Sequence, residues 1–310
     1  MSVALITHPA CLEHDTGPWH PESADRLRAV LRALEAEEFL PLLRELAPAA
    51  SVEQLTRVHP DDYVQAILGI RPEPGEQMPL DSDTSMSAGS AEAALRAAGA
   101  AVHAVDAVMQ GWARNAFAAI RPPGHHAERS RPMGFCLFSN AAVAARHAQA
   151  HWGLKRVAVA DFDVHHGNGT QDIFASDPGL FYVSSHQDPC FPGTGSVAER
   201  GGSNNILNVP LVPGSNGADF RDAWDHIILP ALDAFAPELL IVSAGFDAHK
   251  LDPLAQLRLE TADFRWITER LLAVARRHCG GRLVSLLEGG YDLDALAACA
   301  AAHVRALLHG

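Results

Sequence analysis

The chain has few cysteines, and they form no C-x-x-C pair. The five are Cys11, Cys136, Cys190, Cys279 and Cys299. An odd number at these spacings is a poor disulfide framework, and it offers no thiolate cage for a structural metal. We therefore expect buried free thiols.

Long apolar runs and an excess of positive charge are also missing. No window approaches the roughly 20 apolar residues that a membrane span requires, and no basic stretch precedes an apolar one at the start of the chain. We expect no membrane association and a cytoplasmic location. The formal net charge is -13. Such a charge would repel a phosphate backbone, so nucleic-acid binding is disfavoured, whereas cationic peptides or amines would be attracted.

What is present suits one large globular core. The 310 residues are 48% hydrophobic and 20% charged, with no internal repeat and no low-complexity block. We expect a single domain over residues 1–310. The segment RPEPGEQMP (71–79) is predicted to be a surface excursion rather than a linker, and it is compatible with a homo-oligomer contact.

Short apolar runs alternate with Ala- and Leu-rich stretches of helical spacing. The predicted strands are VALIT near the N-terminus and residues 116–120, 156–161, 180–185, 206–211, 238–245 and 282–290. The predicted helices are residues 23–38, 88–111, 139–151, 218–235, 261–279 and 292–309. Wholly apolar runs suit strands buried on both faces. The alternation predicts an α/β fold of three layers, a mainly parallel central sheet flanked by helices.

Unusual polar clusters follow five of the predicted strands. They are RPPGHH, DFDVHHGNG, SSHQDPCFPGTG, GFDAHKLDP and EGGYD. Ligands of open α/β sheets bind at the carboxyl ends of the strands, so these clusters are expected to share one crevice.

Asp163-Val164-His165 is the sharpest local signal within these clusters. Residues two apart on an extended strand face the same side, so the carboxylate and the imidazole would point at one spot while Val164 enters the core. Asp247, from GFDAH, supplies a second carboxylate. Three such ligands with an open position suit a catalytic metal, Zn²⁺ before Fe²⁺ or Mn²⁺. Asp161 lies further back on the same face and would support an imidazole.

At this point the sequence resembles a known family. RPPGHHA, DFDVHHGNGTQ, FPGTG, SAGFDAH and EGGY, in this order, resemble the histone deacetylase superfamily, in particular its class II branch with bacterial histone-deacetylase-like and acetylpolyamine amidohydrolases. HPE (20–22) and LDSDT (80–84) extend the likeness over nearly the whole chain. The resemblance implies the arginase/deacetylase fold, one catalytic Zn²⁺ and hydrolysis of an N-acyl bond on an amine side chain, with an acylated lysine peptide or a small acylated amine as substrate.

The resemblance also implies ligands and roles. Asp163, His165 and Asp247 would bind the zinc. A structural K⁺ would be held largely by main-chain oxygens of a set that comprises Asp161, Asp163, His165, Phe174, Ser184 and Ser185.

Amide hydrolysis needs an activated water, a stabilised oxyanion and a proton for the leaving amine. By motif, His126 would be general base and then acid, oriented by Asn168, where class I enzymes carry aspartate. His125 would be its electrostatic partner, oriented by Asp161. Tyr291 would donate a hydrogen bond to the oxyanion.

The substrate residues follow from the same motifs. Gly134-Phe135 and Phe191 resemble the residues that line a narrow acyl-lysine tunnel, although Cys190 stands where relatives commonly carry Phe. Polyamine-preferring relatives carry a gatekeeping glutamate where this chain has Leu254, so acyl-lysine is favoured. Asp83 is expected at the rim, accepting hydrogen bonds from a substrate main chain.

Three alternatives stay open. The first is a binuclear arginase-like enzyme, which would want a carboxylate where Gly167 stands. The second is an acetylpolyamine amidohydrolase, against which Leu254 argues. The third is a non-catalytic reader of acyl-lysine, which the complete set of ligands and Tyr291 disfavour.

Overall fold

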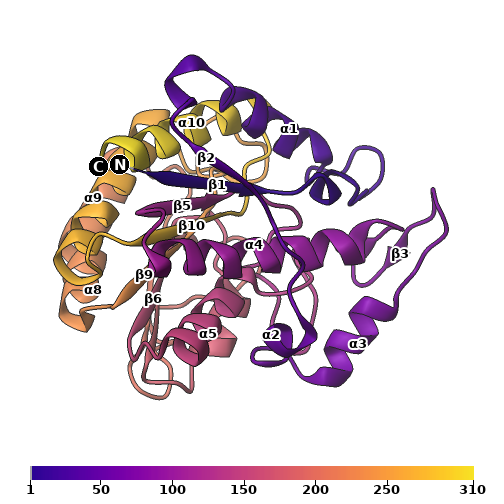
Figure 1. The fold of residues 1–310 in the computed structure, drawn as a ribbon. Helices are drawn as coiled ribbons and strands as arrows, with labels where there is room; N and C mark the ends of the chain where they lie inside the picture. The colour runs from indigo at the N-terminus through magenta and orange to yellow at the C-terminus, as the bar shows by residue number, and fades with distance from the viewer. Residues whose placement is uncertain (1) are drawn as a thin grey trace.

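The computed structural model describes residues 2–310, and its centre is an eight-stranded sheet (Figure 1). The spatial order of its strands is β2-β1-β5-β10-β9-β6-β7-β8, and every neighbouring pair in it is parallel. The strands are β1 (Val3–Thr7), β2 (Leu43–Leu46), β5 (Asn115–Ala118), β6 (Val157–Asp161), β7 (Leu180–Gln187), β8 (Ile206–Leu211), β9 (Leu239–Ala244) and β10 (Leu283–Leu287). A small antiparallel hairpin pairs β3 (Met78–Pro79) with β4 (Ser85–Met86).

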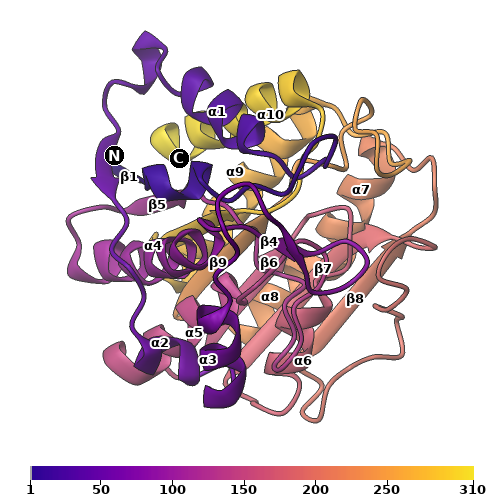
Figure 2. The same ribbon diagram turned by 90° about the vertical axis from the view of Figure 1, so that its right-hand side faces the viewer.

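Helices cover both faces of this sheet (Figures 1 and 2). The α-helices are α1 (Ala24–Ala33), α2 (Val52–Thr56), α3 (Asp61–Gly69), α4 (Ser90–Gln110), α5 (Asn140–Trp152), α6 (Asn168–Phe174), α7 (Gly217–Ala223), α8 (Leu229–Phe235), α9 (Thr261–His278) and α10 (Leu293–His309). Shorter helical turns are η1 (Pro9–Leu12), η2 (Glu37–Phe39) and η3 (Trp224–Ile228), the last a π-helical turn. The α/β architecture of three layers is as the sequence predicts.

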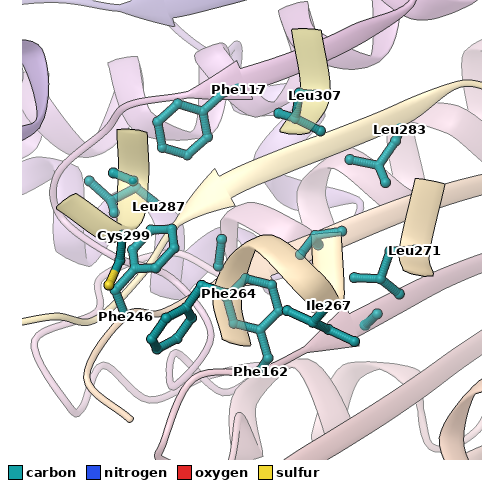
Figure 3. Close-up of a cluster of buried hydrophobic side chains, with 14 of the residues drawn as sticks. Phe117, Phe162, Phe246, Phe264, Ile267, Leu271, Leu283, Leu287, Cys299 and Leu307 are labelled. Atoms are coloured by element: carbon teal, nitrogen blue, oxygen red, sulfur yellow. The ribbon is translucent and has the colours of Figure 1, made fainter. Parts of the chain in front are cut away.

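Alternate residues of each strand feed two separate cores, because successive side chains of a strand point to opposite faces. Phe117, Leu283 and Leu287 pack with α9 and α10 on one face, where Phe162, Phe246 and Phe264 form an aromatic cluster (Figure 3). Ala116, Ala118, Val284 and Leu286 pack with α4 and α5 on the other. Burial on both faces explains why these strands read as continuous apolar runs.

Each predicted strand and helix corresponds to an observed one, with shifted limits, but the short helices α2, α3 and α6, the β3–β4 hairpin and the edge strand β2 were not predicted. The helix predicted over 218–235 is divided into α7, the π-helical turn and α8, and Pro230, which has no N–H to donate, lies at the start of α8. The edge strand β2 was not predicted, because its sequence LREL is exposed along its whole length and shows no apolar run. The 71–79 segment is largely exposed and leads into the β3–β4 hairpin.

The parallel topology brings all carboxyl ends of the strands to one edge of the sheet. The carboxyl ends of β5, β6, β7, β9 and β10 and the segments that follow them carry the five polar clusters, so these clusters meet at this edge although they are spread over residues 121–292. Within residues 2–310, no helix has the length and apolar character needed to cross a membrane.

Candidate active site

Asp163, His165 and Asp247 converge at the centre of this edge. His165 Nδ1 lies 3.2 Å from Asp163 Oδ1 and 3.1 Å from Asp247 Oδ2, and the candidate ligand atoms all lie within 4.8 Å of one another. All three side chains are buried. Among the described residues this is the one group of three or more His, Cys, Asp and Glu side chains that could hold a metal ion.

The two carboxylates are held in place by main-chain donors. Asp163 Oδ2 accepts from the Gly289 N–H (2.8 Å), and Asp247 Oδ1 accepts from the Val164 N–H (2.9 Å). A β-carbon at Gly245 would lie 2.0 Å from Asp163 Oδ2, and one at Gly289 would lie 2.1 Å from Asp247 Oδ2. Two carboxylates and an imidazole, buried together, suit a divalent cation such as Zn²⁺, because its charge would offset the cost of burying two negative charges.

The local backbone differs from the sequence prediction. β6 ends at Asp161, so Asp163 and His165 lie on the bend that follows the strand rather than on it. The alternation nevertheless persists, since Val164 is fully buried in the core. The His165 N–H donates to Asp163 Oδ1 (2.9 Å), which closes the bend and turns both side chains to one side.

His125 is held between two carboxylates. Its Nδ1 lies 3.0 Å from Asp161 Oδ2, which also accepts from the Tyr182 hydroxyl, and its Nε2 lies 3.8 Å from Asp163 Oδ2. Burial lowers the pKa of His125, but the negative charges of Asp163 and Asp161 outweigh it and raise the pKa to about 10. Asp161 thus contacts His125, the arrangement that the sequence predicts.

His126 lies in a different electrostatic setting although it is the next residue. Its Nδ1 lies 2.8 Å from Asn168 Oδ1, and its ring is 4.0 Å from that of His125. Burial and the adjacent rings of His125 and His165 hold the pKa of His126 well below its usual range. The protein's own groups therefore give the two neighbouring imidazoles opposite tendencies, one cationic and one neutral, which suits an electrostatic partner and a base.

Tyr291 follows β10 and approaches the same centre. Burial and the charges of Asp247 and Asp163 raise the pKa of its phenol well above 10, although Arg26 opposes this. The phenol therefore stays protonated at neutral pH and can donate a hydrogen bond. The Tyr291 N–H donates to Asp252 Oδ2 (2.7 Å), which fixes its backbone.

Aromatic rings surround the cluster. Phe191 packs edge-on against His126 (5.0 Å between ring centroids) and His165 (6.1 Å), and Phe135 packs edge-on against Tyr291 (5.9 Å). Gly134 lies against His126, where a β-carbon would come within 2.4 Å of the ring.

Asp83 and Leu254 lie on segments that are hydrogen-bonded to the loops of Gly134 and Tyr291. Asp83 Oδ1 accepts from the Gly134 N–H (3.1 Å) and the Thr84 hydroxyl (2.8 Å), so this oxygen is engaged within the protein. Leu254 is 37% exposed, and its N–H donates to Asp252 Oδ1, which joins it to the carboxylate that holds Tyr291.

The potassium ligands that the resemblance implies lie on β6, on the bend after it, on α6 and on β7. Asp161, Asp163, His165 and Ser184 belong to neighbouring strand ends, and for these the K⁺ assignment stays a prediction. For Ser185, which follows Ser184 in β7, the assignment also stays a prediction; its hydroxyl accepts from the indole N–H of Trp224.

The carbonyl oxygen of Phe174 is engaged within the protein. It accepts from the Asn205 side-chain amide (2.8 Å), which also donates to the carbonyl oxygens of Asp177 (3.0 Å) and Leu180 (2.9 Å). The amide nitrogen thus occupies the point on which these three oxygens converge.

Sequence reasoning missed several residues that support the site. Glu288 Oε2 accepts from the main-chain N–H groups of Gly124 (2.7 Å) and His125 (3.2 Å). Burial raises the pKa of Glu288 to about 7. Its place at the head of EGGY, directly after β10, was a usable signal.

A fully buried ion triad also went unnoticed. Glu22 lies between Arg26 (2.9 Å) and Arg121 (2.5 Å). Arg26 also donates to the Gly290 carbonyl, and its guanidinium lies 4.8 Å from the centroid of the Tyr291 ring. Arg121 begins the RPPGHH segment, so one carboxylate links the loops that carry the histidine pair and Tyr291.

The geometry argues against a binuclear metal site. A β-carbon at Gly167 would lie 2.4 Å from Asp161 Oδ2 and 2.6 Å from the Tyr182 hydroxyl. A carboxylate at this position has no room, so the arginase-like alternative is disfavoured.

Comparisons with known proteins agree with this arrangement. The family model described as "Histone deacetylase domain" matches residues 20–307. The chain is 42% identical to "Histone deacetylase-like amidohydrolase" of Pseudomonas aeruginosa, over 93% of this chain and 81% of that protein, and 37% identical to "Probable deacetylase" of Archaeoglobus fulgidus, over 95% and 82%. The solved structure "Crystal Structure of HDA15 HD domain" superposes with a TM-score of 0.93 at 37% identity, covering 99% of this chain and 88% of that one.

Proposed function

Because the chain belongs to the histone deacetylase family and is a hydrolytic deacetylase, we propose that it removes the acyl group from N-acyl-lysine side chains with the help of one Zn²⁺. The convergence of Asp163, His165 and Asp247 beside the His125–His126 pair carries this proposal. Asn168, an amide beside His126, agrees with a class II-like enzyme.

Zn²⁺ held by these three residues would lower the pKa of water to about 7 and polarise the scissile carbonyl. His126, neutral and carrying its proton on Nδ1 toward Asn168, would accept a proton from water on Nε2 and later deliver it to the leaving amine. His125, held by Asp161, would favour the developing negative charge. Tyr291 would donate its hydroxyl proton in a hydrogen bond to the oxyanion.

The surroundings favour a lysine side chain over a long polycation. Phe135 and Phe191, which pack against Tyr291 and His126, would grip a four-carbon stem by apolar contact, and Gly134 lets the chain pass close to the His126 ring. Leu254 puts an apolar side chain, not a carboxylate, on the segment next to Tyr291. Asp83 Oδ1 accepts from the Gly134 N–H and the Thr84 hydroxyl, and the other carboxylate oxygen would receive a substrate N–H.

The test is acetate release from an acetyl-lysine peptide, compared with N-acetylputrescine and acetylspermidine, with and without a chelator and with Zn²⁺ added back. We expect turnover of the peptide, loss with the chelator and recovery with Zn²⁺. Faster turnover of the acetylated polyamines would favour the amidohydrolase alternative. Turnover that withstands complete metal removal would contradict the mechanism.

A control variant separates metal binding from folding. Asp247→Asn keeps the shape of the side chain and one ligand oxygen, but removes a charge from the centre. We expect zinc content and turnover to fall together, while the far-ultraviolet circular dichroism spectrum is unchanged.

A further inference from the structure

Glu128 stands directly behind the residue that contacts His126. Its Oε1 accepts from Asn168 Nδ2 (2.7 Å), while Asn168 Oδ1 faces His126 Nδ1 (2.8 Å). The chain of contacts therefore runs from a carboxylate through an amide to an imidazole. None of the sequence motifs used above assigns a role to Glu128.

The two ends of a carboxamide differ, since the nitrogen only donates and the oxygen only accepts. A carboxylate only accepts, so Glu128 requires the nitrogen end of Asn168 to face it. The oxygen end must then face His126, whose Nδ1 has to carry a proton in order to donate. The second ring nitrogen, Nε2, is left with a free lone pair.

Without Glu128 the Asn168 carboxamide could adopt a second orientation. Asn168 could rotate by half a turn about its last bond and offer its nitrogen to His126, which would favour the tautomer with the proton on Nε2. In that tautomer His126 cannot accept a proton at Nε2. The nearby sulfur of Met133, 3.2 Å from Asn168 Nδ2, is a weak acceptor and holds the amide less firmly than a carboxylate does.

We propose that Glu128 is a positioning residue that sets the tautomer of His126 by fixing the orientation of the Asn168 carboxamide. This inference rests on the proposed function only for its consequence on turnover, because the tautomer itself is a property of the resting protein.

The local fold is built to hold this arrangement. The Glu128 N–H donates to the Arg131 carbonyl (3.0 Å), which closes a tight turn after the histidine pair. The first turn of α6 docks on the same segment, where the N–H groups of Gly169 (3.0 Å) and Thr170 (3.1 Å) donate to the His125 carbonyl. Asn168, at the start of α6, is thereby fixed between the turn and His126.

Three variants separate the acceptor role of Glu128 from its charge and its bulk. Glu128→Gln keeps an acceptor oxygen and removes the charge, and Glu128→Met keeps the volume and removes the strong acceptor. Glu35→Met is the matched control, because Glu35 is exposed and remote from the site in sequence and contacts.

Each variant would be measured for kcat and KM on an acetyl-lysine peptide and for zinc content. The ring nitrogens of His126 would be observed by ¹⁵N NMR, with the His126→Ala protein used to assign them. For Glu128→Met we expect kcat to fall about tenfold with KM and zinc content unchanged, and the Nε2-protonated tautomer to become populated. Glu128→Gln is expected to keep kcat within about threefold of the wild type, and Glu35→Met to match the wild type.

A Glu128→Met protein with wild-type kcat and an unchanged Nδ1-protonated tautomer would overturn the proposal. An equal loss in Glu128→Gln and Glu128→Met would also overturn it, because the negative charge and not the amide orientation would then matter. If the wild type turns over none of the acylated substrates, the proposed function fails while the NMR comparison still decides the tautomer.

Discussion

Replacing Glu22 by Gln is expected to destabilise the protein by about 3 kcal/mol. The Glu22 side chain is fully buried and accepts from Arg26 and Arg121. Burial alone would raise the pKa of Glu22, but the two guanidiniums outweigh it and lower the pKa from 4.5 to about 2. At about 1.4 kcal/mol per pKa unit, this drop corresponds to about 3 kcal/mol. Removing one partner of a buried ion pair costs a similar amount, about 3–5 kcal/mol.

The assay is urea unfolding of the wild type and Glu22→Gln at pH 7, repeated at lower pH. Glu53→Gln is the control, because Glu53 is 80% exposed and its pair with Arg57 (2.8 Å) lies on the surface of α2. We expect less than about 0.5 kcal/mol from the control.

The pH dependence supplies a second check on Glu22. Its native pKa lies below its ordinary value, so its stabilising effect is complete above about pH 4.5 and is lost as the pH falls toward 2. The difference between wild type and Glu22→Gln should therefore be constant near neutrality and shrink on acidification. A neutral-pH difference as small as that of Glu53→Gln, or one that does not shrink, would refute the reasoning.

Three other substitutions test the site and its support. Tyr291→Phe should lower kcat about 10²- to 10³-fold without changing zinc content, since it removes one oxyanion donor; full retained turnover in a kinetic assay would show that another group donates. Asn168→Asp should raise the pKa of His126 by placing a carboxylate on it, so the acidic limb of the pH–rate profile should move to higher pH; an unmoved limb would assign it to another group. Asn205→Ala should lower the melting temperature, measured by calorimetry, because the carbonyl oxygens of Phe174, Asp177 and Leu180 lose the amide donor that they share, at about 1–3 kcal/mol for each oxygen left unsatisfied.

Much of the fold could be predicted because the strands are buried on both faces. Runs such as LLIVSA in β9, all of whose residues are buried, carry no polar alternation, and that pattern indicates both the strand and its place in a covered parallel sheet. The sequence of β2 has no apolar run, because its four residues are exposed at the edge of the sheet. Its pairing with β1 depends on contacts between residues that are distant in the sequence. The division of the 217–235 helix depends on how the chain accommodates Pro230, which periodicity does not show.

The central residues of the site were predictable because they are polar residues directly after predicted strands. Their supports were not, because their partners are far away along the chain or are main-chain atoms. Arg26 donates to Gly290, 264 residues later, and in the sequence it is one of several arginines on an amphipathic helix. Glu128 resembles an ordinary charged loop residue until α6 brings Asn168 beside it.

Gly245 and Gly289 leave no room for a β-carbon beside the carboxylates of the candidate metal site, so they limit how these carboxylates can be arranged. A methyl group at 245 or 289 would have to displace an oxygen of Asp163 or Asp247. The spacing of the candidate ligand atoms therefore depends on the absence of side chains at these two loop positions as well as on the ligands themselves. Laboratory evolution toward a different metal preference should therefore keep both glycines while it varies the ligands. A larger residue at position 245 or 289 would itself move the carboxylates, so the effect of a ligand change could not be read separately.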